Sequence, residues 1–326
     1  MKTFAKRQFL GCMAAGLAAA FAPAAYSQES AASWPSKPVT IVVGYTAGGP
    51  TDMIGRILAE QLSKKFNQTF IVENKPGAGG VVAATQLSKT KADGYTLMIG
   101  SSGTLTIAPH LAPNFPFDPI KDLTAIGLVA NYPYFLVVPA DSKYNTLEEL
   151  LEGSKSAHMS FASAGNGAVN HLAGEWLTSL GKMNAAHIPY RGDSAAVTDL
   201  IGGRVDFAFL AGAVAIPQSQ SGKLKVLASG SLTPGRGGKT ISEAKFKGFS
   251  AEPWNGLMAP PGLPADIAKK INDGINEVMH KPEVVAQLAK MEQYPLTGPS
   301  SDYTKMIQTE SARWKQLIES ANIKAQ

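Results

Sequence analysis

Short apolar runs rich in β-branched residues alternate with amphipathic segments along most of the chain. The first run covers residues 39–43, and similar runs follow at 69–73, 95–100, 123–129, 135–139, 159–162, 187–190, 205–210, 225–229 and 256–259. Between them, apolar residues recur at helical spacing, as in the stripe formed by Ile54, Ile57, Leu58 and Leu62. Regular alternation of strands and helices is typical of parallel sheets flanked by helices. The pattern therefore predicts an α/β fold with mainly parallel sheets.

The last part of the chain has a different pattern, because it is nearly all helical from Pro264 onward. A last long helix is expected to carry Trp314 and Leu317 on its apolar face. We expect this tail to return to the first of two lobes and to bury both side chains there. The chain would then cross between the lobes twice, near 132–135 and 250–254. This organisation gives a discontinuous first lobe (34–134 plus 253–326) and a second lobe (135–252), joined by a hinge.

The first 27 residues have the pattern of a signal peptide. Lys2, Lys6 and Arg7 form a basic region, residues 9–21 are apolar and rich in alanine, and residues 25–27 offer a small-x-small cleavage site. The pair Lys6-Arg7 is close to the twin-arginine pattern, but its first residue is lysine, so an ordinary Sec signal is favoured. We expect the signal (1–27) to be removed on export to the periplasm of a Gram-negative cell. The rest of the chain lacks an apolar stretch long enough to span a bilayer, so we expect a soluble protein.

The composition argues against several classes of function. Cys12 is the one cysteine and lies in the signal, so the mature chain offers neither a disulfide framework nor a thiolate nucleophile. The formal charge is +5, but three of the positive charges also lie in the signal, which leaves the mature chain nearly neutral. We find no basic run with interleaved aromatic residues. Nucleic acid is therefore not an expected partner, and we expect a monomer.

Four turns rich in glycine or hydroxyl residues lie between a predicted strand and a predicted helix. They cover residues 46–51, 77–80, 100–104 and 163–167. In an open α/β sheet such turns lie at the carboxyl ends of the strands, where ligands bind. The helix that follows directs backbone N–H groups and the positive end of its dipole to the same place. Each turn alone is most often a tight connection, but four of them together predict a shared cleft that binds an anion.

The sequence lacks the complete residue set of an enzyme site. Residues 77–83 are similar to a dinucleotide fingerprint, but Pro76 stands directly before them and no acid ends a second strand about 20 residues later. A G-x-S-x-G nucleophile turn is absent. The five histidines do not have the spacing of metal ligands, and there are no thiolates to complete a zinc site. We therefore expect no catalytic residue, no metal and no cofactor.

Three polar residues beside these turns have two interpretations each. Asp52 begins a helix, where it either caps the helix or faces a ligand. His171 falls off the apolar stripe of its helix, so a place on the polar face is favoured over a place in the cleft. Asp206 follows a Gly-Gly turn and either stabilises a turn or hinge or contacts the ligand.

Arg191 is the one cation beside a turn of this kind. It could pair with a carboxylate of the ligand. A structural ion pair with Asp193 or Asp199 is the favoured interpretation.

A set of ordered motifs resembles one known family. The motifs are "WPSKPVTIVVGYTAGGPTD", "IVENKPGAGG", "ADGYTLMIGS", "FDPIKDLTAIGLV", "LVVPADS", "SAGNGAVNHLAGE", "IPYRGDSAAVTDLIGGRVDFAF", "GKLKVLA", "WNGLMAPPGLP" and "RWKQLIESANIK". They run collinearly from about Trp34 to Lys324, and their order resembles the Bug-type extracytoplasmic solute receptors of tripartite tricarboxylate transport systems. One departure is the segment "TPGRGGKTISEAKFKGFS", where the family commonly has a proline- and acid-containing segment.

The resemblance implies a two-lobed periplasmic binding protein, with two crossovers, that closes on a small ligand. It implies a carboxylate ligand (a di- or tricarboxylate, an amino-acid-like anion or an aromatic acid), held by backbone groups and ordered water from loops of both lobes. Carried over to this sequence, the first lobe offers Tyr45, Thr46, Gly48, Gly49, Asp52, Ser101, Ser102 and Thr104. The second lobe offers Ser163, Ala164, Gly165, Asn166 and His171, with Asp206 near the hinge side.

The function that follows is a receptor that delivers an organic acid to integral membrane transporter subunits. Two alternatives use the same cleft: an exported hydrolase or lyase, and a ligand sensor for a membrane signalling partner. If the cleft works by close backbone approach, a branched side chain at Gly49 or Gly165 should abolish binding and leave the fold largely intact.

Overall fold

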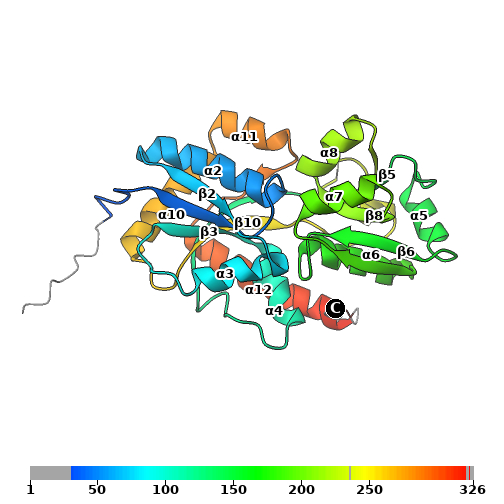
Figure 1. Cartoon of the computed structure of the whole chain (residues 1–326), viewed down its shortest axis with the longest axis horizontal. Helices are drawn as coiled ribbons and strands as arrows, with labels where there is room; N and C mark the ends of the chain where they lie inside the picture. The colour runs from blue at the N-terminus through cyan, green and yellow to red at the C-terminus, as the bar shows by residue number, and fades with distance from the viewer. Residues whose placement is uncertain (1–30, 235, 321–322, 324–326) are drawn as a thin grey trace, which may run out of the picture.

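The computed structural model describes residues 31–234, 236–320 and 323, and its two sheets lie at opposite ends of the molecule (Figure 1). The first sheet has six described strands in the order β11-β4-β10-β3-β1-β2, and the second has five in the order β7-β6-β8-β5-β9. The predicted signal peptide lies outside the described residues. None of the described helices is both long enough and apolar enough to cross a membrane.

Each predicted strand is present, with ends that differ from the prediction by no more than two residues. The first sheet contains β1 (Val39–Val43), β2 (Phe70–Asn74), β3 (Thr96–Ser101), β4 (Thr124–Asn131), β10 (Trp254–Ala259) and β11 (Tyr294–Pro295). The second contains β5 (Tyr134–Pro139), β6 (Met159–Ser163), β7 (Ala185–Pro189), β8 (Phe207–Ala211) and β9 (Leu224–Ser229). The two-residue strand β11 was not predicted, because it is too short to have a hydrophobic period.

The predicted α/β fold, with sheets flanked by helices in two lobes, is confirmed, but the sheets are mixed rather than mainly parallel. Strand β1 is parallel to β2 and β3, and β6 is parallel to β7 and β8. In contrast, β10 is antiparallel to β3 and β4, and β5 is antiparallel to β8 and β9. The reason is the double crossing. A strand that has just crossed from the other lobe begins at the cleft, whereas the strands followed by helices end there.

Helices cover both faces of each sheet (Figure 1). Those of the first lobe are α2 (Pro50–Phe66), α3 (Val81–Leu87), α4 (Ala108–Leu111), α10 (Ala265–Met279), α11 (Pro282–Ala289) and α12 (Ser300–Ser320), with the short turns η2 (Ala78–Gly80) and η3 (Gly103–Ile107). Those of the second lobe are α5 (Leu147–Gly153), α6 (Val169–Gly181), α7 (Asp193–Ile201), α8 (Gly212–Gln220) and α9 (Ile241–Ala244). The predicted stripe of α2 is confirmed, because Ile54, Leu58 and Leu62 are fully buried.

The helical tail packs on the first sheet, as predicted. Helix α12 lies against β4 and η3. Tyr303 is fully buried, and its ring stands edge-on to Trp254, with 5.6 Å between the ring centroids. Trp314 is also buried, but Leu317 is only partly buried, because the next residue, Ile318, takes the inward position. The tail is therefore part of the core of the first lobe.

The two crossing segments are hydrogen bonded to each other. The chain leaves β4 at Asn131 and enters β5 at Tyr134, and it returns just before β10. The amide N of Tyr132 donates to the carbonyl O of Pro253 (3.1 Å), and that of Tyr134 donates to the carbonyl O of Ala251 (2.8 Å). The hinge is thus a short two-stranded ribbon. The residue bounds given above for the two lobes stay a prediction.

Candidate functional site

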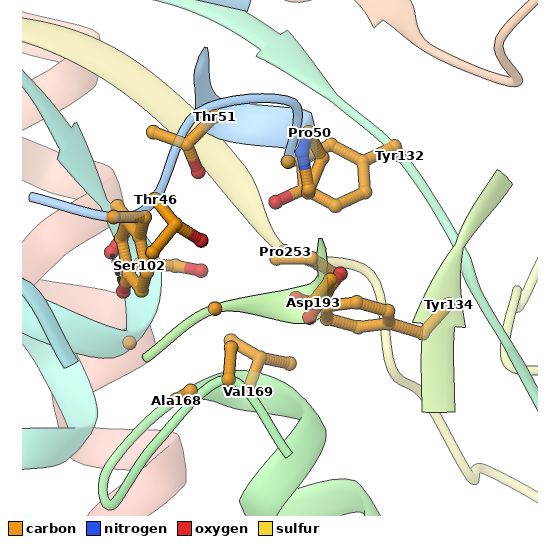
Figure 2. A pocket seen from close by; sticks show the side chains of 16 residues that line it. Thr46, Pro50, Thr51, Ser102, Tyr132, Tyr134, Ala168, Val169, Asp193 and Pro253 are labelled. Carbon is orange, nitrogen blue, oxygen red and sulfur yellow. Dashed lines mark hydrogen bonds between the residues drawn. The ribbon is translucent and has the colours of Figure 1, made fainter. Parts of the chain in front are cut away.

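A small cavity of about 20 Å³ lies between the lobes, next to the hinge. We call it the inner cavity. Its walls come from both lobes: residues of 45–51, 101–103 and 132 on one side, residues of 134, 164–169 and 192–193 on the other, and Pro253 from the returning segment. Figure 2 shows that their side chains converge on one space. A cavity of this size holds about one water-sized group.

A larger chamber of about 550 Å³ opens next to the inner cavity. We call it the outer chamber. It is lined by residues of 77–81, 108–116, 164–167 and 189–191, together with Gly44 and Tyr45. Tyr45 and Ala164 line both spaces. The four predicted turns therefore do meet in one cleft, but they divide between two compartments of it.

The lobes are in contact across this cleft. The amide N of Thr46 donates to the carbonyl O of Arg191 in the second lobe (3.3 Å). A Cβ atom built on Gly103 would lie 2.8 Å from the carbonyl O of Gly167, which also belongs to the second lobe. The structure is therefore a closed form, in which backbones of the two lobes approach each other at glycine positions.

Tyr45, Ser101 and Thr104 form a hydrogen-bonded group within the first lobe. The hydroxyls of Tyr45 and Thr104 donate to the carbonyl O of Gly79, at 2.8 and 2.6 Å, and Ser101 Oγ lies 2.8–2.9 Å from both hydroxyls. Tyr45 and Ser101 also line the inner cavity, whereas Thr104 is fully buried and lines neither space. The direct ligand contact predicted for Thr104 is not supported, and its place is that of a support for the 77–80 turn.

Asp52 is also a structural residue. Its Oδ2 accepts from the amide N of Gly48 and from Arg56 Nε, both at 2.9 Å, and its Oδ1 accepts from Asn74 Nδ2 at 2.8 Å. Burial alone would raise the pKa of Asp52, but these hydrogen bonds, together with the charge of Arg56, lower it. Asp52 and Gly48 line neither space, and the carboxylate holds the turn in front of α2.

His171 lies behind the 163–167 turn and not in the cleft. It is fully buried, so its predicted place on the polar face of the helix was wrong. The cause is tertiary packing: its ring stacks on that of His187, with 4.0 Å between the centroids, and its Nδ1 accepts from the amide N of Gly167 (3.2 Å). Burial lowers the pKa of His171 to about 4 and, together with the charge of His171, lowers that of His187 to about 3.

Ser163 Oγ lies 2.6 Å from His187 Nε2, and such a pair is the first part of a nucleophilic catalyst. The remaining parts are missing. Ser163 is fully buried and lines neither space, and His187 Nδ1 has no hydrogen-bond partner among the described residues. An acid that would orient the imidazole is therefore absent from this part of the structure. The described residues also hold no cluster of three His, Cys, Asp or Glu side chains arranged for a metal.

The stacked histidines predict a loss of stability in acid. An unfolded chain binds protons at histidine near pH 6.5, whereas these two rings stay neutral in the fold until about pH 4 and 3. Their contribution is thus complete above pH 6.5 and is lost as the pH falls. Asp193, whose pKa is raised to about 7, and Glu175, whose pKa is also raised by burial, act in the opposite direction. His110, whose pKa is lowered mainly by burial, adds to the loss in acid, so three histidines stand against two acids.

We therefore expect the melting temperature to fall from pH 6.5 to 4.5, and His187→Gln should flatten this dependence. His158 is exposed, so His158→Gln serves as the control and should leave the curve unchanged. A melting temperature that is constant or rises on acidification in the wild-type protein would contradict the prediction.

Asp206 lies away from the cleft. It is exposed and precedes β8, and its Oδ2 accepts from the amide N and the hydroxyl of Ser160. The other end of the strand, at Ala211, is the end next to the cleft, about 16 Å away at the usual rise per residue. The predicted place near the hinge side was therefore wrong, and the hydrogen bonds support the alternative of a turn residue.

Arg191 has neither of the ion pairs that were favoured for it. Asp199 pairs with Arg204 instead, at 2.5 Å, and Asp193 has no ion-pair partner among the described residues. The side chain of Arg191 is exposed and lines the outer chamber, where it is the charged residue of the wall. The alternative that Arg191 contacts a ligand is thus the one that the geometry favours.

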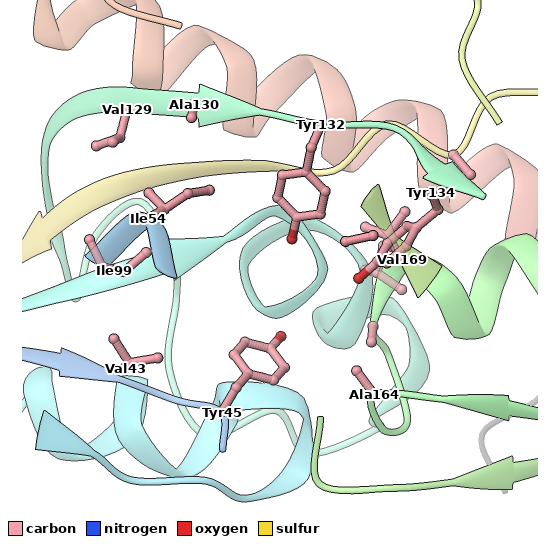
Figure 3. Close-up of a cluster of buried hydrophobic side chains, with 14 of the residues drawn as sticks. Val43, Tyr45, Ile54, Ile99, Val129, Ala130, Tyr132, Tyr134, Ala164 and Val169 are labelled. Atoms are coloured by element: carbon pink, nitrogen blue, oxygen red, sulfur yellow. The ribbon is translucent and has the colours of Figure 1, made fainter. Parts of the chain in front are cut away.

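The sequence analysis did not identify three residues that now are candidates for the site: Tyr132, Tyr134 and Asp193. All three line the inner cavity and are at least 96% buried. Figure 3 shows the two tyrosines, together with Tyr45, at the cleft end of the apolar core. Burial raises the pKa of each tyrosine, and the charge of Asp193 raises it further, so the hydroxyls remain hydrogen-bond donors at neutral pH. Both tyrosines lie at a predicted crossing point between the lobes, and this position could have indicated that they face the cleft.

Gly49 and Gly165, at which a branched side chain was predicted to abolish binding, differ in how much room they leave for a side chain. Gly49 has ordinary extended dihedral angles, and a Cβ atom there would meet nothing closer than 3.6 Å. Gly165 has φ +131°, and its Cβ would lie 3.0 Å from the carbonyl O of Tyr190 in the same lobe. A branched residue at Gly165 would therefore disturb the second lobe itself, in contrast to the expectation of an intact fold.

Comparisons of the sequence and of the fold with known proteins point to one family of solute receptors. The family model described as the tripartite tricarboxylate transporter family receptor matches residues 54–323. A Cupriavidus necator relative, a UPF0065 protein in the gbd 5′ region, is 35% identical over 94% of this chain and 95% of its own length. The solved structure of periplasmic binding protein BugD has a TM-score of 0.86 at 31% identity and covers 90% of this chain and 100% of its own.

A second solved structure, MatC from Rhodopseudomonas palustris with bound malate, has a TM-score of 0.83 at 28% identity and covers 87% of this chain and 100% of its own. The match of the family model to most of the chain, the relative and the two structures agree with each other and with the order of motifs in the sequence. The chain belongs to the family of tripartite tricarboxylate transporter receptors.

Proposed function

We propose that this protein is a periplasmic receptor that captures a small organic carboxylate between its two lobes and delivers it to membrane transporter subunits. The observation that carries the proposal is the cleft itself, because both of its compartments have walls from both lobes. A ligand in such a cleft makes its full set of contacts only when the lobes meet. Malate in the structure of MatC supports a carboxylate as the class of ligand.

The chemistry of the walls supports the same class. In the outer chamber, the guanidinium of Arg191 provides a positive charge, and the turns 77–80 and 163–167 bring backbone groups close to the space. In the inner cavity, the hydroxyls of Thr46, Ser102 and the tyrosines are neutral groups that can both donate and accept hydrogen bonds. A hydrogen bond to a charged group contributes about 1.5–3 kcal/mol. A few such contacts reach the roughly 8 kcal/mol of a micromolar complex, after part is lost to ordering.

A screen of small organic acids by thermal shift tests the proposal. At a ligand concentration of about 100 times Kd, the free energy of unfolding should rise by about 2.7 kcal/mol, which is a measurable shift in melting temperature. Small-angle scattering with the best acid should then show a smaller radius of gyration than without it. If none of the acids stabilises the protein, the proposed function fails. If an acid binds and the radius does not change, the closing motion fails.

A further inference from the structure

The two compartments of the cleft carry opposite charges. Among the described residues, Asp193 is the one charged residue that lines the inner cavity, and Arg191 is the one that lines the outer chamber. Their Cα atoms are two residues apart, so the distance between them is at most about 7 Å. The two spaces share Tyr45 and Ala164 in their walls, so one small molecule that extends through both lies next to both residues.

Asp193 is a buried carboxylate without a cation. Its exposed fraction is 2%, and Figure 2 shows it among the side chains that surround the inner cavity. Its Oδ1 accepts from Asn170 Nδ2 at 2.8 Å, but its Oδ2 has only a 3.5 Å contact with the amide N of Ala211. An ionised carboxylate can accept about four hydrogen bonds. An unpaired charge at such a depth is costly, so a missing partner is expected.

The surroundings of Asp193 are built to keep it in place. Asn170 is fixed in its orientation, because its Oδ1 accepts from the amide N of Ala164 and its Nδ2 also donates to the carbonyl O of Phe209. Asp193 is the first residue of α7, where the positive end of the helix dipole favours a negative charge. Burial raises the pKa of Asp193 to about 7, although both hydrogen bonds lower it. A cation beside the carboxylate would favour its ionised form further.

A polar atom of the facing lobe also lacks a partner. Thr46, which lines the inner cavity, has a buried Oγ1 without a hydrogen-bond partner among the described residues. This hydroxyl oxygen can accept a hydrogen bond, as the carboxylate can. The inner cavity has room for about one water-sized group, and an ammonium group has that size and donates three hydrogen bonds.

We propose that Asp193 determines specificity by binding a protonated nitrogen of the ligand, so that the receptor selects a zwitterionic amino-carboxylate over a simple dicarboxylate. The ammonium group occupies the inner cavity against Asp193, and the carboxylate lies in the outer chamber toward Arg191. This inference rests on the proposed function, since it names the class of acid that the receptor captures. A second carboxylate in the place of the ammonium group would meet the like charge of Asp193.

Matched acids test the proposal on the wild-type protein. Each set contains an amino acid, its amine-free acid and the dicarboxylate of the same length: 5-aminovalerate with valerate and glutarate, and 4-aminobutyrate with butyrate and succinate. L-norvaline with valerate and L-glutamate with glutarate test an amine next to the carboxylate. Calorimetry at pH 7.5 should give at least one amino acid that binds ten times or more tightly than each acid it is matched with.

Two variants assign this preference to the residue. Asp193→Asn should lose the preference and bind the dicarboxylate more tightly than the wild-type protein does. Asp199→Asn is the matched control, because Asp199 lies on the same helix but lines neither space. It should keep the wild-type order.

The outcomes separate the two proposals. If no amino acid of any set binds the wild-type protein more tightly than the acids it is matched with, the inference about Asp193 is overturned, and the receptor function stands as long as some acid of the thermal-shift screen binds. If no acid of the sets or of the screen binds, the receptor function fails and the inference fails with it. The wild-type comparison is decisive even if Asp193→Asn does not fold.

Discussion

Replacing Gly103 with alanine should weaken ligand binding by about a hundredfold or more and leave both lobes folded. The three atoms closest to a Cβ at this position all belong to the backbone of the second lobe: the carbonyl O of Gly167 at 2.8 Å, Cα of Ala168 at 3.0 Å and N of Val169 at 3.2 Å. A backbone cannot move aside as a flexible side chain can. The methyl group therefore opposes closure, whereas it meets none of these atoms once the lobes separate.

The expected loss of affinity is large because the ligand is bound in the closed form, which the methyl group opposes. A hundredfold loss of affinity corresponds to about 2.7 kcal/mol, which is the order expected for forcing two packed backbones apart. The fold should not suffer, because Gly103 begins a helical turn with no left-handed φ, and alanine favours helix over glycine.

Gly49→Ala is the matched control. It also adds one methyl group to a first-lobe turn at the cleft, but that methyl meets only ordinary contacts at 3.6 and 3.8 Å. Calorimetry with the best acid of the thermal-shift screen, with circular dichroism for the fold, compares the two variants. If Gly103→Ala binds within threefold of the wild-type protein, the closed form described above is not the ligand-binding form.

Truncation after Thr297 should abolish folding. It removes α12, whose buried face includes Tyr303, Ile307, Trp314 and Ile318. Burial of one large apolar side chain contributes roughly 1.5–3 kcal/mol, so four contribute about 6–12 kcal/mol. This is comparable with the 5–15 kcal/mol that is typical of the whole stability of a domain. Circular dichroism and the soluble yield of the truncated chain measure the effect.

A point variant checks that packing is the cause. The side chain of Tyr303 occupies the space above Gly256 and Gly100. A Cβ on Gly256 would come within 2.4 Å of its ring, and one on Gly100 would come within 2.8 Å of its hydroxyl. Tyr303→Ala should lower stability by about 3–5 kcal/mol. Tyr303→Phe keeps the ring and removes a hydroxyl that has no partner among the described residues, so it should keep the wild-type stability. A truncated chain that is soluble and binds the acid would count against the place of α12 in the first lobe.

The strands and the cleft turns could be predicted because their signals are local. An apolar run such as 39–43 followed by a glycine turn and a proline at the start of a helix fixes the place of strand, turn and helix within a few residues. The loops that line the cleft follow from the rule that such turns gather at the carboxyl ends of strands. The direction of β10 and β5 could not be predicted, since it depends on which lobe a strand enters from.

Individual side chains at the site were harder to predict, because burial is a tertiary property. Asp193 and Asp52 both stand in the first turn of a helix, where either can act as an ordinary dipole partner. Only the tertiary structure shows that their roles differ. Asp52 accepts three hydrogen bonds, one of them from Arg56, whereas Asp193 faces a cavity. The sequence of α6 gives no sign that His171 stacks on His187, because His187 lies in strand β7.

The paired ribbon at the hinge has a consequence for the strength of binding. Each lobe by itself offers the ligand a half-site, and a half-site of a few hydrogen bonds is weak. Because residues 132–134 and 251–253 are hydrogen bonded to each other, the lobes are joined by a connection with little freedom, unlike a single flexible tether. Once one lobe holds the ligand, the other meets it at an effective concentration in the millimolar range or above. The ribbon thus turns two weak half-sites into one bivalent receptor without adding any contact to the ligand.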